Sequence, residues 1–271
     1  MIRRAMDAPP PNEAHARLAA NADASFILES REGPKRMSRY SFVGANPAGV
    51  ATLTNRLHVD GALPEPGPEE TPLAYLRRVQ ASYHVDDHET PFIGGLVGSF
   101  GYDFVQELEP SLAASAPSAS SWPKFQLGLY LDALVYDHHE ETVHYVSRGE
   151  DRYDEWQALL AAPRPAEPLR VGPVSCPVSD DEFKARVEAA KGLIAEGENF
   201  QIVLSRPFHA DYEGPLGALY DGIRRDHAVP YLFHVRFDRR ELLGASPEML
   251  VRVRNRRVET FPIAGTRPVT G

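Results

Sequence analysis

The residues best placed to do chemistry lie near the end of the chain, in the segment Pro262 to Pro268, which reads PIAGTRP. Gly265 and Thr266 follow a strand-like run there. Glycine lets other atoms approach the backbone closely, and a threonine hydroxyl adds a side-chain donor, so the pair could hold a small anion. The same residues also suit an ordinary turn after a strand. Taken alone, the motif leaves both interpretations open.

Two earlier motifs make this one more specific. Residues 196–206 read EGENFQIVLSR, and residues 244–248 read GASPE. The three motifs, in this order and at these spacings, resemble the chorismate-utilising enzyme family, and most closely anthranilate synthase component I. The resemblance covers nearly the whole chain, but only about the N-terminal half of the family's usual length. It therefore implies the N-terminal portion of such an enzyme.

The resemblance implies that Gly265 and Thr266 contact chorismate, a dicarboxylate whose conversion develops charge that fixed donors stabilise. Glu248 matches a family signature, either as a structural carboxylate or as a participant. Ala264 separates the subfamilies, because aminodeoxychorismate synthases usually carry a lysine there, and alanine can act neither as nucleophile nor as base. Ammonia would then be the attacking group, which favours anthranilate synthase. Aminodeoxychorismate synthase component I remains the alternative, and isochorismate-type water addition matches less well.

The reaction implied by the resemblance converts chorismate and ammonia into anthranilate and pyruvate in tryptophan biosynthesis. A glutamine amidotransferase subunit, anthranilate synthase component II, would supply the ammonia. The family uses Mg²⁺, and its metal ligands and catalytic residues lie well beyond the Gly-Thr motif. We therefore expect the Mg²⁺ ligands beyond residue 271, no catalytic or metal-binding residue within this fragment, and no activity from the chain alone. The sequence Arg267-Pro268-Val269 departs from the family's usual Arg-Pro-Arg-Gly, which leaves the local loop geometry open.

Two short segments match the places where anthranilate synthases bind L-tryptophan as a feedback inhibitor, namely Leu28-Glu29-Ser30 and Pro230-Tyr231-Leu232. By this resemblance, Ser30 and the peptide groups of the second segment would hold the ammonium and carboxylate, and Tyr231 would pack against the indole. The alternative is that both segments are only sheet core. A further alternative is that the protein is a non-catalytic tryptophan-binding module.

Two residues beside this pocket carry weaker expectations. Arg39 lies in a family motif, Arg39-Tyr40-Ser41-Phe42, and either lines the pocket or pairs with an acidic neighbour on the surface. Glu29, between Leu28 and Ser30, is a candidate for a further contact with the inhibitor. The sequence leaves the roles of both residues unassigned.

Composition indicates a folded protein without a membrane span. The 271 residues are 42% hydrophobic, enough to bury a core, and no apolar run approaches the ~20 residues that cross a bilayer. The N-terminus lacks the apolar core of a signal peptide, so we place the protein in the cytoplasm. A formal net charge of −9 opposes nucleic-acid binding, and the single cysteine, Cys176, excludes an internal disulfide.

A cluster of prolines between residues 163 and 177 predicts a boundary between two lobes. We expect an N-terminal lobe over residues 1–162, a linker over 163–178, and the start of an incomplete chorismate-binding domain over 179–271.

Alternating runs and helix caps predict the elements that must position these residues. Strands are expected at 25–30, 40–44, near 50–53, and at 125–137, 142–147, 201–208, 231–237, 241–245, 249–254 and 257–263. Helices are expected after Thr71, after Ser179, whose capping box with Glu182 fixes the start, and over 216–223. The fold class is therefore α+β, with mixed, largely antiparallel sheets and packed helices. By the resemblance, it is like anthranilate synthase component I and is truncated before the C-terminal catalytic half.

Two segments invite other functions but favour structural roles. The glycine-rich run 92–103 matches neither the dinucleotide-binding nor the Walker pattern, so its glycines are expected to allow close packing of strands. His138, His139 and His144 fall in the turn and on the strand surface of the 125–147 hairpin, where metal binding is disfavoured.

Overall fold

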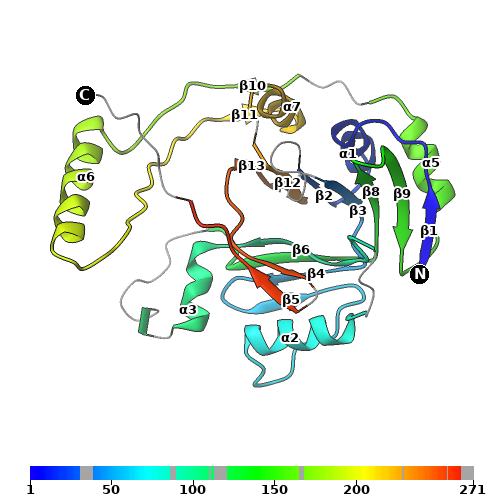
Figure 1. Cartoon of the computed structure of the whole chain (residues 1–271), viewed down its shortest axis with the longest axis horizontal. Helices are drawn as coiled ribbons and strands as arrows, with labels where there is room; N and C mark the ends of the chain where they lie inside the picture. Colours follow the sequence, from blue (N-terminus) through cyan, green and yellow to red (C-terminus); the bar gives the residue numbers. More distant parts are fainter. Residues whose placement is uncertain are drawn as a thin grey trace. The chain divides into compact units, whose positions relative to one another are not determined.

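The computed structural model describes residues 1–30, 39–85, 90–109, 111–112, 121–164, 168–227, 229–254 and 256–263 (Figure 1). The chain divides into two compact units. The first combines Met1–Pro165 with Tyr220–Gly271, and the second is Ala166–Leu219. The sequence predicted a linker that begins at residue 163, close to the boundary between the two units. Tyr220–Gly271 nevertheless belongs to the first unit, because a strand over residues 232–237 pairs with one over residues 24–29.

A seven-stranded antiparallel sheet forms the centre of the first unit. Its strands, in spatial order, are β1 (Ile2–Ala5), β9 (Thr142–Ser147), β8 (Asp132–Asp137), β3 (Tyr40–Ala45), β2 (Ala24–Glu29), β12 (Tyr231–Phe237) and β13 (Arg240–Ser246). Strand β2 lies between β3 and β12, so it joins the early and late parts of the chain. All six residues of β2 pair with β12.

Helices cover one face of this sheet. They are α1 (Pro11–Ala19), α5 (Tyr153–Ala161) and the part of α7 (Gly217–Asp226) that belongs to the first unit. Leu18, Trp156 and Tyr220 bury their side chains from these helices against Ile27 and Val43 of the sheet. Because residues alternate along a strand, Ser25 and Glu29 share this face with Ile27.

A second, four-stranded antiparallel sheet packs on the other face. Its order is β5 (Leu57–Val59), β4 (Gly49–Leu53), β7 (Phe125–Tyr130) and β6 (Gly95–Phe100). Phe26 and Phe237 from the large sheet meet Val97 and Tyr130 from the small one. Helix α2 (Pro72–Ser82) covers the far side of the small sheet (Figure 1). The short helices η1 (Tyr102–Phe104) and α3 (Val105–Leu108) follow β6, and β14 (Arg252–Arg254) and β15 (Arg257–Glu259) form a late hairpin.

The second unit is small. It contains β10 (Arg170–Val171), paired with β11 (Tyr212–Glu213), and helix α6 (Asp180–Ala195). Within α6, Ala190 alone is buried, and Leu193 and Ile194 are about two-fifths exposed (43% and 41%). The helix therefore presents apolar side chains to solvent.

Local signals in the sequence are confirmed. The hydroxyl of Thr71 accepts a hydrogen bond from the N–H of Ala74 at 3.2 Å, and α2 begins directly after Thr71. The hydroxyl of Ser179 likewise accepts from the N–H of Glu182 at 3.2 Å and starts α6. The α+β fold class with largely antiparallel sheets is also confirmed.

Two strand predictions are wrong. The run 125–137 is not one strand, because the chain passes from the small sheet to the large sheet at Leu131 and forms β7 and β8. The run 201–208 is not a strand within the described residues, where its backbone meets no partner before the bridge between Ser175 and His209. A strand needs a neighbour to bond its N–H and C=O groups, which a sequence pattern alone cannot supply.

Candidate ligand site at the strand ends of the large sheet

The two predicted inhibitor-binding segments meet at the ends of two neighbouring strands of the large sheet. Strand β2 ends at Glu29 and β12 begins at Tyr231, and their antiparallel register pairs Glu29 with Leu232. The next pair outward is therefore Ser30 and Tyr231, with Pro230 directly before the strand. The ends of antiparallel neighbours lie together although the two segments are far apart in sequence.

An aromatic surface lies beside Ser30. Leu28 pairs with Phe42 in the β2–β3 register, so Tyr40 is the neighbour of Ser30 on that side. The rings of Tyr40 and Phe42 stack with centroids 6.2 Å apart, and Phe92 lies 5.5 Å from Phe42. Alternation along the strands places Ser30, Leu28 and Phe42 on the face that packs against the small sheet. A hydroxyl next to an aromatic wall can bind an aromatic amine or acid.

Sequence reasoning missed the aromatic part of this surface. Tyr40 and Phe42 lie in the Arg39-Tyr40-Ser41-Phe42 motif that was singled out for Arg39 alone. Their alternation in a predicted strand was the signal that places both rings on one face. Phe92 had no such signal, because it reaches the site from a loop before β6.

Glu29 points to the opposite face of β2, toward the helices. Its carboxylate accepts hydrogen bonds from the hydroxyl of Tyr220 at 2.9 Å and from the guanidinium of Arg224 at 3.0 Å, and its side chain is 1% exposed. Burial, followed by the Glu29 charge, raises the pKa of the Tyr220 hydroxyl far above its usual range. Burial opposes the charge of Arg224, but the hydrogen bond to Glu29 and the negative charges around Arg224 together outweigh burial and raise the pKa of that guanidinium.

Arg39 pairs with an acidic neighbour, as one of its two predicted roles required. Its guanidinium donates to both oxygens of Asp137, at 2.7 to 3.1 Å, and lies 4.9 Å from the ring centroid of Tyr40. The hydrogen bond from Arg39 holds the pKa of the Asp137 carboxyl below its usual range. Arg39 therefore packs on the Tyr40 ring of the aromatic surface.

Glu248 links two of the three family motifs. Its N–H donates to the hydroxyl of Ser246 at 3.2 Å in the turn after β13, and its exposed carboxylate accepts from the N–H of Ile263 at 3.3 Å. Ile263 directly precedes the segment with Gly265 and Thr266, and both of these predicted chorismate contacts lie outside the described residues. The structure thus gives Glu248 a bond that holds the start of that segment.

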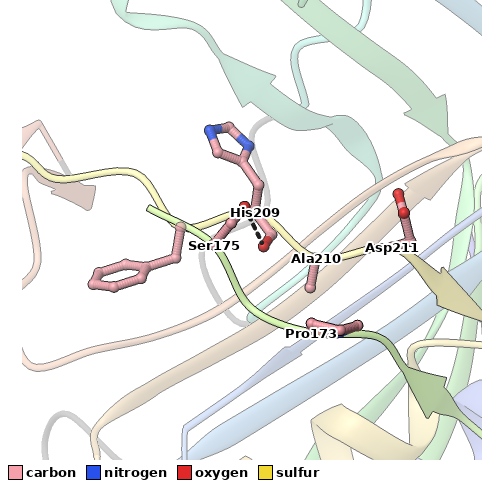
Figure 2. Close-up of a pocket in the computed structure, with 6 residues that line it drawn as sticks. Pro173, Ser175, His209, Ala210 and Asp211 are labelled. Carbon is pink, nitrogen blue, oxygen red and sulfur yellow. Dashed lines mark hydrogen bonds between the residues drawn. The ribbon is translucent and has the colours of Figure 1, made fainter. Parts of the chain in front are cut away.

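The second unit carries a separate open pocket of about 380 Å³, lined by Pro173, Ser175, Phe208, His209, Ala210 and Asp211 (Figure 2). The hydroxyl of Ser175 donates to the backbone carbonyl of His209 at 3.4 Å. Figure 2 shows the imidazole of His209 and the carboxylate of Asp211 well apart. This serine, histidine and aspartate are not arranged as a nucleophile with its base.

The described residues contain no group of three or more histidine, cysteine, aspartate or glutamate side chains that could hold a metal ion. Cys176 donates to the carbonyl of Val178 and accepts from Arg206, both at 3.1 Å, so its thiol is engaged in local packing. Across the same described part of the chain, every helix is too short or too polar to cross a membrane.

Residues 23–271 match a protein family described as chorismate binding enzyme. "Anthranilate synthase component 1" of Methanothermobacter thermautotrophicus is 34% identical over 95% of this chain and 54% of its own length. The protein of the same name from Mycolicibacterium smegmatis is 32% identical over 98% of this chain and 57% of its length. The crystal structure of anthranilate synthase component I from Streptococcus pneumoniae superposes with a TM-score of 0.61 at 26% identity, over 83% of this chain and 53% of that one. The chain thus spans about half the length of the relatives it matches.

Proposed function

Since this chain belongs to the family of chorismate binding enzymes, we propose that it is part of the large subunit of an anthranilate synthase and carries its L-tryptophan site. The observation that carries the proposal is the meeting of Ser30 and Tyr231 beside the Tyr40 and Phe42 rings. The names of its relatives and their coverage of this chain support the enzyme class.

The proposed whole enzyme converts chorismate and ammonia into anthranilate, pyruvate and water. Ammonia forms a C–N bond to the ring while the ring hydroxyl leaves as water, and loss of the side chain as pyruvate then makes the ring aromatic. The ammonia would come from glutamine through a partner amidotransferase subunit, in the cytoplasm. By the resemblance to this family, we place the Mg²⁺ ligands and the catalytic groups of the whole enzyme beyond residue 271.

The part of this chain in that reaction is to supply one edge of the chorismate site. Gly265 and Thr266 would donate to a carboxylate of chorismate, and the bond from Ile263 to Glu248 would hold the segment that carries them. Donors of this kind bind a substrate, but by themselves they do not turn it over. We therefore expect no anthranilate from this chain with chorismate, ammonium and Mg²⁺, and detectable anthranilate fluorescence would contradict that expectation.

The tryptophan site combines an apolar wall with a few polar groups. Tyr231, Tyr40 and Phe42 offer ring surface to an indole, and aromatic contacts of this kind supply most of the affinity. The Ser30 hydroxyl and the peptide groups at the strand ends can bind the ammonium and carboxylate, which fixes the orientation of the ligand.

Calorimetric titration of the chain with L-tryptophan tests this site. We expect saturable binding that Ser30→Ala and Tyr231→Ala each weaken about tenfold or more, equivalent to ~1.4 kcal/mol. Ser82→Ala is the matched control, because that exposed serine donates to its own helix, through the carbonyl of Arg78 at 2.9 Å. No heat from the unmodified chain, or equal binding by all three variants, would rule out the site.

A further inference from the structure

Glu29 lies between Leu28 and Ser30 in sequence, but its side chain lies on the opposite face of the large sheet from theirs. Leu28 and Ser30 face the small sheet, whereas the Glu29 carboxylate is buried under helix α7 with 1% exposure. A carboxylate held there cannot lie on the same side of the strand as a ligand that covers Ser30. Glu29 can therefore affect such a ligand only indirectly, through the side chains that its carboxylate binds.

Two side-chain partners of Glu29 come from one face of α7. Tyr220 and Arg224 are four residues apart and so lie one helical turn apart on the same side. The Tyr220 hydroxyl and the Arg224 guanidinium bind the same carboxylate, at 2.9 to 3.0 Å. The ring of Tyr220 also stacks on His234 of β12, with centroids 6.0 Å apart. Helix α7 is therefore fastened to β2 and β12 at once.

The chain leaves this helix and enters the candidate site within a few residues. Helix α7 ends at Asp226, and the N–H of His227 still donates to the carbonyl of Ile223 at 2.9 Å. Pro230 and Tyr231 follow almost directly. The position of the last turn of α7 thus determines the position of Tyr231, the first residue of β12.

The next arginine along the helix provides a contrast. Arg224 is 25% exposed and reaches inward to Glu29, whereas Arg225 is 73% exposed and pairs with its neighbour Asp226. Charge-assisted hydrogen bonds to a buried carboxylate are strong and directional, and surface pairs contribute little. The two arginines carry the same charge, but only Arg224 is built into the sheet.

We propose that Glu29 and Arg224 are positioning residues, which hold the start of β12 against Ser30 and so set the affinity of the tryptophan site without touching the ligand. The effect on tryptophan affinity rests on the proposed function. The mechanical part, in which the pair holds the start of β12, does not depend on it. Losing the pair frees the last turn of α7, and Tyr231 then loses its fixed place opposite Ser30.

The mechanical part is tested by hydrogen exchange of the peptide that covers residues 229–237. We expect Arg224→Gln to speed its exchange about tenfold or more, and Arg225→Gln, with the same loss of charge on the same helix, to leave it unchanged. Tyr220→Phe removes one bond to Glu29 and should give a smaller acceleration in the same peptide. That variant keeps the test decisive if Arg224→Gln does not fold. Unchanged exchange in Tyr220→Phe and in a folded Arg224→Gln overturns the proposal.

The ligand part is tested by titrating the same variants with L-tryptophan. Glu29→Gln and Arg224→Gln should each weaken binding about tenfold or more, the double variant no more than either one, and Arg224→Lys should recover part of the loss. A purely structural role would lower the melting temperature but leave the affinity of the folded protein intact, which would contradict the proposal. If the unmodified chain binds no tryptophan, the proposed function fails while the exchange result still decides the positioning pair.

Discussion

The imidazole rings of His15 and His234 meet edge to face beneath helix α1, with centroids 5.1 Å apart. His15 shares a hydrogen bond of 3.1 Å with the Ser25 hydroxyl, and Nε2 of His234 lies 2.6 Å from the Glu241 carboxylate. Burial, with further contributions from His234, Arg236 and Arg164, holds the pKa of His15 well below 6.5. The folded protein therefore keeps His15 neutral.

The stability of the protein should fall as the pH drops below 6.5. In the unfolded chain His15 takes up a proton near that pH, whereas in the folded chain it stays neutral, so acid favours unfolding. The slope for one such group is at most ~1.4 kcal/mol per pH unit. His138 and His144, whose pKa values burial also lowers, add to it.

Urea unfolding at pH 7.5, 6.5 and 5.5 measures this dependence. His15→Gln should reduce the loss of unfolding free energy between pH 6.5 and 5.5, because glutamine does not titrate. An equally steep loss in the variant would mean that His15 does not contribute.

The buried pair of Asp132 and Arg152 should be asymmetric under mutation. Arg152 donates to both carboxylate oxygens at 2.6 and 2.8 Å, and the side chains are 6% and 20% exposed. Burial still raises the pKa of Asp132 despite the hydrogen bonds from Arg152. Removing the arginine strands a buried carboxylate, whereas removing the carboxylate leaves an arginine that can reach water.

Arg152→Met should therefore cost about 3–5 kcal/mol of unfolding free energy, and Asp132→Asn should cost less. Arg4→Gln, which breaks a surface pair with Asp151, is the control and should change stability by less than about 1 kcal/mol. Denaturant unfolding of the three variants provides the measurement, and equal costs for Arg152→Met and Asp132→Asn would contradict the asymmetry.

Gly98 allows the close pairing of β6 and β7. A Cβ at this position would overlap the carbonyl of Gln126 on the neighbouring strand. We expect Gly98→Ala to lower the unfolding free energy by more than about 2 kcal/mol. Gly222→Ala, in the middle of α7, has room for a methyl group and should be neutral or stabilising by up to ~1 kcal/mol. Thermal melting of both variants shows whether the loss of stability comes from the close contact at Gly98 or from replacing any glycine.

Tyr40 should contribute to tryptophan affinity although no ligand role was predicted for it. It neighbours Ser30 in the sheet and stacks on Phe42. Tyr40→Ala should weaken L-tryptophan binding about threefold to tenfold, the range expected for one aromatic contact. Tyr102→Ala, at a 93% exposed tyrosine, is the control and should bind as the unmodified chain does. Equal L-tryptophan affinities for the two variants would show that Tyr40 does not contact the ligand.

The sequence predicted those parts of the fold that depend on neighbouring residues. The caps at Thr71 and Ser179 act over three residues, so the starts of α2 and α6 could be placed from the sequence. Helix α1 was not predicted, although Pro11 is its first residue and proline is typical of that position. Strand β1 and helix α5 were also missed, since both are short and gain their place only by packing on the large sheet.

Long-range partners could not be predicted. Periodicity identifies β7 and β8 as strands, but it does not show that they belong to different sheets. The resemblance named Ser30 and Tyr231 together, and the register of β2 and β12 places them side by side. The partners of Glu29 were not foreseeable, because Tyr220 lies 191 residues further along the chain.

The pairing of β2 with β12 also affects how the protein is made. Strand β2 lies in the middle of the large sheet, yet its second neighbour ends at Phe237. At ~5–20 residues per second of translation, β2 emerges from the ribosome on the order of ten seconds or more before β12 does. Throughout that interval one edge of an apolar strand, with Phe26 and Ile27, has no partner from its own chain. The nascent protein must therefore avoid pairing with other chains until Phe237 has been synthesised.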